Sequence, residues 1–176
     1  MRKLMFLAIP AVLAASPAFA QSTSVTGTVN IDGSVAGRCT FTLPSVNLSL
    51  GELSLASNGK LDVSRVNGKQ ATLTGWCNNT AATMAVTTTQ LTTGTAAPTG
   101  FDNRVDYTAT AVANSASASD SSLTAGAGTP STVGLFTGNI VVTLSAASSP
   151  SNGLMVGGGY TGNVVVTLTP TATPAP

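Results

Sequence analysis

Hydrophobic and polar residues alternate with a period of two over much of the chain after residue 20. The plainest case is the segment 25–35, in which polar Thr, Asn, Asp or Ser residues alternate with aliphatic residues or glycine. The aliphatic and glycine positions are Val25, Gly27, Val29, Ile31, Gly33 and Val35. A period of two is that of a β-strand, and the abundance of Thr, Ser, Gly and Val disfavours helices. The pattern predicts an all-β chain whose first strand has one face of Val, Gly and Ile only.

Further alternating segments, each bounded by Gly, Asn or Pro, predict strands at 38–43, 45–50, 60–66, 71–77, 83–91 and 104–112. The sequence of residues 137–144 returns almost unchanged at 161–168, which predicts two similar core strands, and the glycines at 157–159 predict a turn before the second of them. Residues 113–130 are mostly Ala and Ser and predict a flexible surface loop. Many short strands joined by turns are typical of a β-sandwich or barrel.

Charge and composition exclude several function classes. Only 7% of the residues are charged and none is His. The few scattered cations argue against nucleic acid as a partner, and the lack of imidazole excludes His-based catalysis and His-ligated metal sites. Asp102 and Asp106 share a strand face with Arg104, and such a row is interpreted as solvated ion pairs rather than a catalytic pair or a cation site. We therefore predict no enzyme, no metal and no cofactor.

The first twenty residues predict a signal peptide. Arg2 and Lys3 precede an apolar run at residues 4–15, and Ala18-Phe19-Ala20 offers small residues at the two positions that a signal peptidase reads. Cleavage after Ala20 would export a mature chain with five basic and six acidic residues and no apolar run of about 20 residues to cross a membrane. In an oxidising compartment the two cysteines, Cys39 and Cys77, predict one structural disulfide.

Three stretches resemble a known family of secreted proteins. They are Val25–Asp32 leading into Gly37-Arg38-Cys39, the segment Leu73–Cys77, and the ending Gly159–Pro170. Together they resemble the subunits of chaperone–usher pili, most closely the spore coat protein U-like, archaic branch. The resemblance implies an immunoglobulin-like, pilin-type β-sandwich over residues 36–170 that lacks its seventh strand, preceded by an N-terminal extension at 21–35 and followed by a Pro-rich tail at 171–176.

In that family each subunit completes its neighbour by donor-strand exchange at a sheet edge. Carried onto this sequence, the donor strand would be Val25, Gly27, Val29 and Ile31, and the acceptor groove would include Tyr160, Val164, Val166 and Leu168. The resemblance implies as partners further copies of this or related subunits, a periplasmic chaperone and an outer-membrane usher. It also implies a cell-surface or extracellular filament with a role in adhesion or biofilm formation.

Two other interpretations stay open from the sequence. The first strand could simply pair at a sheet edge within its own domain. Alternatively, the chain could be a secreted monomeric β-sandwich that binds carbohydrate or another surface ligand through Trp76, Tyr107 and the loop after Ala113.

Overall fold

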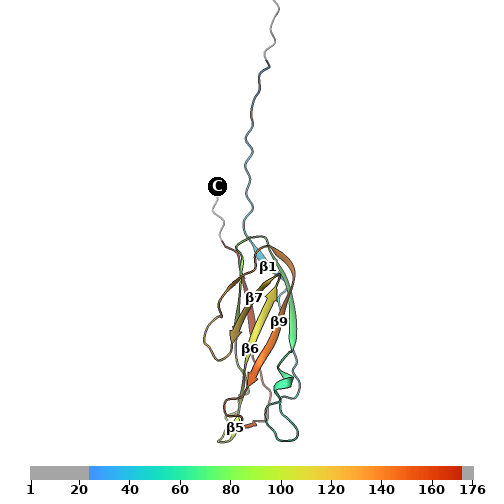
Figure 1. The fold of residues 1–176 in the computed structure, drawn as a ribbon, viewed down its shortest axis with the longest axis vertical. Coiled ribbons are helices and arrows are strands. Elements are labelled where there is room, and N and C mark those ends of the chain that lie inside the picture. Colours follow the sequence, from blue (N-terminus) through green and yellow to red (C-terminus); the bar gives the residue numbers. More distant parts are fainter. Residues whose placement is uncertain (1–23, 172–176) are drawn as a thin grey trace, which may run out of the picture. The chain divides into compact units, whose positions relative to one another are not determined.

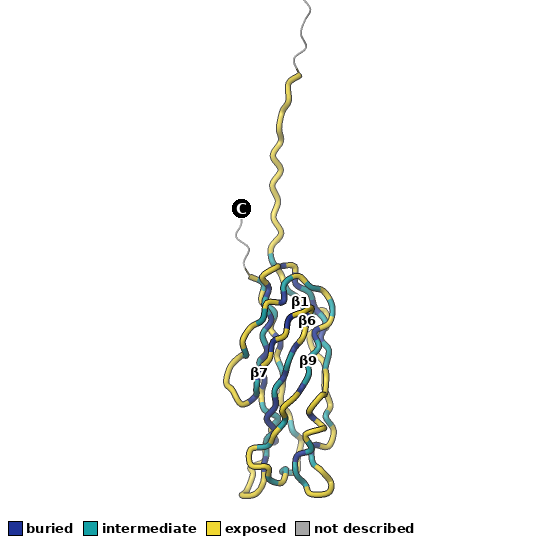
Figure 2. Tube along the Cα trace, in the orientation of Figure 1, coloured by how far each residue is buried: buried dark blue, intermediate teal, exposed yellow. Residues whose placement is uncertain are grey.

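The computed structural model describes residues 24–171, and their contacts divide them between Gly33 and Ser34 into two parts. Residues 24–33 of the first part have no regular secondary structure and are exposed along their whole length (Figure 2). The predicted first strand is therefore not part of any sheet in this chain. An extended segment becomes a strand only when its N–H and C=O groups pair with a neighbour. The predicted signal peptide lies outside the described residues.

Residues 34–171 form an all-β, sandwich-like fold (Figure 1). The larger sheet has the order β1 (Cys39–Leu43), β2 (Gln70–Cys77), β9 (Phe136–Ser148), β6 (Arg104–Ala113), and both β4 (Leu91–Thr92) and β7 (Ala116–Ser121) pair with β6. The smaller sheet has the order β11 (Val164–Thr169), β3 (Thr83–Thr88), β8 (Ser131–Thr132). All of these pairs are antiparallel, whereas β5 (Phe101–Asp102) and β10 (Leu154–Met155) form a separate parallel pair.

The core is filled by the inward-facing residues of both sheets, and the predicted alternation holds in its central strands. In β6, within the strand predicted at 104–112, the odd-numbered residues are buried: Val105, Tyr107, Ala109 and Ala111. The fully buried side chains include Met84 and Val86 from the smaller sheet and Ile140 from the larger one. In β2 the buried positions are Leu73, Gly75 and Cys77, so Trp76, which is half-buried, lies on the opposite face.

The predicted disulfide is confirmed. Cys39 begins β1 and lies directly opposite Cys77, the last residue of β2, and their sulfur atoms are bonded at 2.10 Å. The bond ties the first residue of the first strand to the middle of the chain. A cross-link of this kind stabilises the fold chiefly by restricting the unfolded chain.

The two similar segments at the C-terminal end both contain strands, as predicted, but the strands belong to different sheets. Residues 137–144 lie in β9, which has neighbours on both sides and buries Ile140, Val142 and Leu144. Residues 164–168 of the second copy lie in β11, which is an edge strand and buries only Val166. The same sequence pattern is thus more exposed where a neighbouring strand is present on one side only.

Two predicted strands are wrong. Residues 45–50 form no ladder, although they follow β1 directly. Within 60–66, Lys60 and Leu61 make only isolated bridges, and a 3₁₀-helix forms at Val63–Arg65. Asp62 caps this helix, because its carboxylate accepts hydrogen bonds from the Ser64 backbone N–H and hydroxyl. The side chain of Asp62 thus competes with strand pairing for the local backbone groups.

The flexible loop predicted at 113–130 is also wrong in its first half. Residues 116–121 form β7, which pairs with β6 through a two-residue turn containing Asn114 at φ 54°. Ala116, Ala118 and Asp120 face inward and the serines between them face outward. The Ala/Ser run is therefore a period-two strand pattern, and alanine suffices on its buried face because β7 packs against β3.

The buried carboxylate of Asp120 joins β7 to the smaller sheet. We expect the fold to become less stable when a hydrogen-bond partner of this carboxylate is removed. Asp120 Oδ2 accepts hydrogen bonds of 2.8 Å from both the backbone N–H and the hydroxyl of Thr88. Thr88→Val should lower the free energy of unfolding by about 1.5–3 kcal/mol, because it removes a buried hydrogen bond to a charged group. Urea denaturation measures this, with Thr87→Val as the control; equal stability of both variants would contradict the role of Asp120.

Candidate functional site: the groove beside β11

Two adjoining hollows form one groove beside β11, which we call the β11 groove. The first hollow has a volume of about 480 Å³ and the second about 550 Å³. Both are lined by Leu48, Leu50, Leu91 and Gly162, so they meet at these residues. One wall is the segment 44–54, and the other is β11 with residues 155–163 before it. The groove is long and open, as a site for an extended chain requires.

The floor of the first hollow is apolar and comes from the larger sheet. It is formed by Leu73 of β2, Tyr107 of β6, and Val142 and Leu144 of β9, all buried residues. These strands are adjacent in the sheet, so their inward faces combine into one surface. The β11 groove therefore opens directly onto the hydrophobic core.

The backbone of β11 is unpaired along the groove. β11 pairs with β3 on one side and has no strand on the other side within residues 24–171. The carbonyl of Asn163 accepts a hydrogen bond from the Thr89 N–H, so by alternation the peptide groups of Gly162, Val164, Val166 and Leu168 face the open edge. Such an edge is a template for pairing with a further strand.

The segment 44–50 in the opposite wall also lacks a neighbouring strand among the described residues. Val46, Leu48 and Leu50 alternate along the segment 44–50 and line the first hollow. Val46 is 47% exposed and Leu48 is 37% exposed, although both line a hollow whose floor is buried. The segment lies across the groove from β11 without a ladder of its own, which explains why the strand predicted there does not form.

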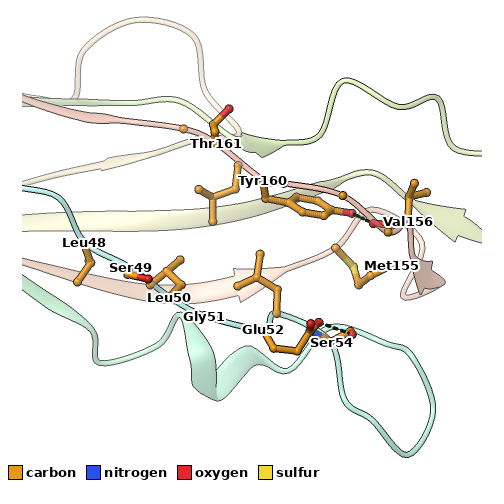
Figure 3. A pocket seen from close by; sticks show the side chains of 16 residues that line it. Leu48, Ser49, Leu50, Gly51, Glu52, Ser54, Met155, Val156, Tyr160 and Thr161 are labelled. Carbon is orange, nitrogen blue, oxygen red and sulfur yellow. Dashed lines mark hydrogen bonds between the residues drawn. The ribbon is translucent and has the colours of Figure 1, made fainter.

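Tyr160 forms the wall of the second hollow across from residues 48–54. Figure 3 shows its ring on the side of the hollow opposite Leu50, with the hydroxyl directed toward Val156. That hydroxyl donates to the Val156 carbonyl at 2.9 Å, and it lies 3.2 Å from the Asp102 carbonyl. Burial raises the pKa of Tyr160 above its ordinary value. Tyr160 is thus fixed in place and forms part of the wall.

The structure places three of the four residues predicted for the acceptor groove along the β11 groove. Val164 and Val166 line the first hollow and Tyr160 lines the second. Leu168 packs against the core at the far end of β11 but lines neither hollow. The sequence interpretation missed the opposite wall and the floor, although the alternation at 45–50 was a signal for the wall. The floor residues gave no such signal, because each of them fits an ordinary core strand.

Tyr107 connects the floor of the groove to both strands of its wall. Its hydroxyl lies 2.8 Å from the carbonyl of Thr89, directly after β3, and 3.3 Å from the carbonyl of Asn163, directly before β11. Burial raises the pKa of Tyr107 to about 12. The neutral phenol therefore holds the two chain segments together at all ordinary pH values.

This raised pKa predicts a loss of stability in alkali. The unfolded chain releases the Tyr107 proton near pH 10, whereas the folded chain keeps it until about pH 12. The folded state binds more protons in that window, so the free energy of unfolding should fall by about 2–3 kcal/mol as the pH rises from 10 to 12. Tyr107→Phe should lose less stability over the same window in urea titrations, and an equal loss in both proteins would contradict this origin.

The solvated ion-pair row predicted at residues 102–106 is wrong, because both carboxylates are buried. Asp102 accepts hydrogen bonds from the Ser151 N–H and hydroxyl and from the Gly153 N–H, the last at 2.7 Å. Burial alone would raise the pKa of Asp102, but the hydrogen bonds from Ser151 and Gly153 outweigh it and lower the pKa. Asp106 lies 3.4 Å from Arg104 Nε. Asp102 therefore fastens the 149–153 turn to β5.

The structure also bears on the surface-ligand interpretation. Tyr107 is buried, so its ring is not available for stacking on a ligand. The segment after Ala113 is the β6–β7 hairpin. Trp76 is half-buried on the outer face of β2 and lines neither hollow of the β11 groove. Among residues 24–171, no group of three or more Cys, Asp or Glu residues could hold a metal ion.

Comparisons with known protein families, with curated proteins and with solved structures give no significant match for this chain. Within residues 24–171 the structure has no helix long and apolar enough to span a membrane.

Proposed function

We propose that this chain is a structural subunit of a chaperone–usher type surface filament and that it polymerises by donor-strand exchange. The observation that carries the proposal is the β11 groove, in which an unpaired strand edge lies beside an open apolar floor. The exposed segment 24–33 supplies the complementary pattern, since Val25, Val29 and Ile31 are each more than 80% exposed. A sheet edge and a free extended segment of alternating pattern are the two parts that strand addition requires.

The positions of the two ends of residues 34–171 support one direction for such an exchange. Asn78 donates to the Ala36 carbonyl and Asn79 donates to the Thr171 carbonyl, so the chain enters this part of the molecule beside the place where β11 ends. The other end of the groove lies near β5, at the opposite end of the sheets (Figure 1), because the Val156 N–H donates to the Asp102 carbonyl.

Head-to-tail stacking of subunits would then determine whether the donor segment runs parallel or antiparallel to β11. If the Ala36 end of one subunit meets the β5 end of the next, residue 33 of the incoming segment lies at the β5 end of the groove and residue 24 lies toward the end of β11. The segment therefore pairs with β11 antiparallel. The four residues 34–37 span at most about 14 Å, so the subunits would be closely joined. A segment that folded back into the groove of its own subunit would instead run parallel to β11, which makes the two arrangements distinguishable.

The energetics are sufficient for a persistent joint. Three buried aliphatic side chains contribute about 1.5–3 kcal/mol each, and the backbone ladder along β11 adds further hydrogen bonds. A head-to-tail contact that does not close into a ring produces an open fibre. The low charge of the chain, 7% of its residues, reduces repulsion between neighbours in such a fibre.

The size of the mature protein with and without residues 21–33 tests the proposal. The full mature chain, secreted with its chaperone and usher, should form filaments, and the shortened chain should stay a folded subunit that does not polymerise. Thr26→Ser with Thr28→Ser is the matched control, because it alters the extension and leaves its apolar face intact. Equal polymer size for the full and shortened chains in electron microscopy and light scattering would overturn the proposal.

A further inference from the structure

We infer that the donor segment pairs with β11 in one register, in which Gly27 lies opposite Val166 and Ile31 lies opposite Gly162. This inference rests on the proposed function and adds to it the residues that determine which segment fits. The same register places Val25 opposite Leu168, Val29 opposite Val164 and Gly33 opposite Tyr160.

Strand geometry first limits the registers to steps of two residues. In β11 the inward-facing residues are even-numbered, with Val166 buried and Val165 on the outer face 48% exposed. The apolar residues of the donor are odd-numbered. A slip of one residue would turn Thr26, Thr28 and Asn30 onto the apolar floor, where their polar groups would lose water without gaining partners.

Among the even-numbered positions from Tyr160 to Leu168, Gly162 is the one without a side chain. It lines both hollows, together with Leu48, Leu50 and Leu91. A Cβ atom at this position would lie 2.7 Å from the Gln90 carbonyl oxygen, so no larger residue fits there without moving the backbone. Gly162 lies where the two hollows meet, so an aliphatic side chain of the partner strand opposite Gly162 would enter open space lined by the three leucines.

Side-chain size then selects among the remaining registers. The register proposed here puts Ile31, the largest residue of the donor face, against Gly162, and it puts Gly33 against the ring of Tyr160. A shift of two residues in one direction would force Ile31 against Tyr160. The opposite shift would place Gly33 against Gly162 and leave the junction of the hollows unfilled, and it would pair Val25 with Pro170, which has no N–H for the ladder.

Engineered disulfides across the outer face test the register in filaments of the full mature chain. In the proposed register Thr28 lies directly opposite Val165, and both residues point away from the floor. Their Cα atoms would form a close, non-hydrogen-bonded pair, which suits a disulfide. Val165→Cys is combined in three separate chains with Thr26→Cys, Thr28→Cys or Asn30→Cys. Because these four positions are exposed, each chain should fold normally.

Thr28→Cys with Val165→Cys should give a ladder of cross-linked multimers on non-reducing gels, at least about tenfold faster than the other two pairs, whose diagonal neighbours are about 7–8 Å apart. Faster multimer cross-linking through Thr26→Cys or Asn30→Cys, or filaments without cross-linking in any chain, would overturn the register and leave the proposed function intact. Cross-links confined to single chains, or the absence of both filaments and cross-links, would overturn the proposed function itself.

Discussion

The subunit without residues 21–33 is expected to melt at a higher temperature when a synthetic peptide copying residues 22–35 is added. A ligand that binds only the folded state stabilises it by mass action, by about 2.7 kcal/mol at a concentration 100 times the dissociation constant. For a domain of this size that free energy corresponds to a rise in Tm of about 5–10 °C. Thermal unfolding followed by circular dichroism at increasing peptide concentration measures the effect.

The physical reason lies in the groove walls. Val46 and Leu48 are partly exposed beside buried floor residues, and the peptide groups of Val164 and Val166 face an open edge. A docked strand would cover the aliphatic side chains and pair with the exposed backbone groups. Both contributions are absent from the unfolded chain, so they appear fully as stabilisation of the folded subunit.

A matched pair of peptides separates strand docking from unspecific binding. Replacing Val29 and Ile31 with Ser removes the apolar face and should abolish most of the rise in Tm. Replacing Thr28 and Asn30 with Ser changes as many residues on the outward face and should leave the rise unchanged. If neither peptide differs from the natural sequence, or if the natural peptide has no effect, the β11 groove is not an acceptor for this segment.

The strands that could be predicted from the sequence are those in which large apolar side chains alternate visibly with polar ones. In β9 the large aliphatic residues Ile140 and Val142 are buried at alternate positions, and in β6 Val105 and Tyr107 show the same pattern. β7 carries the same period in Ala116 and Ala118, but its side chains are so small that composition suggested a loop. Its burial depends on the approach of β3, which no local property of the sequence reports.

The errors at 45–50 and 60–66 have different physical causes. At 60–66 the alternation was overridden by a single capping side chain, Asp62, which draws the backbone into a 3₁₀ turn. At 45–50 the alternation is real, because Val46, Leu48 and Leu50 all line the groove. The segment has the pattern of a strand without a neighbour on its groove side, and in the proposed filament the donor from another copy would be that neighbour.

The candidate site could be predicted only in part for the same reason. Tyr160 directly precedes the last alternating segment and Val164 and Val166 lie within it, so these residues could be assigned to one wall from the sequence. The floor combines Leu73, Tyr107 and Val142 from three strands whose order in the sheet is set by the topology. The apolar character of each residue predicts burial, but only the fold shows that these residues border an opening.

Gly27→Val is expected to weaken filament assembly while leaving the subunit's own fold unchanged. In the described structure a Cβ atom at Gly27 would meet no other atom within 4 Å, so the subunit has room for the new side chain. In an ordinary exposed strand the change would be mildly favourable, because glycine weakens strands and β-branched residues favour them. The effect on a donor strand should have the opposite sign.

That opposite sign follows from the residue that faces position 27 in the proposed register. Val166 is buried beneath the groove, so an added valine would overpack the contact and push the donor backbone off the edge of β11. Overpacking of this kind costs about 1–3 kcal/mol, which corresponds to roughly 5- to 150-fold weaker strand binding. Filaments of Gly27→Val should be short in electron micrographs, whereas Thr28→Val, on the outward face, should assemble like the natural chain. Equal filament lengths for both variants would remove the reason to assign the segment from Val25 to Ile31 as a donor strand.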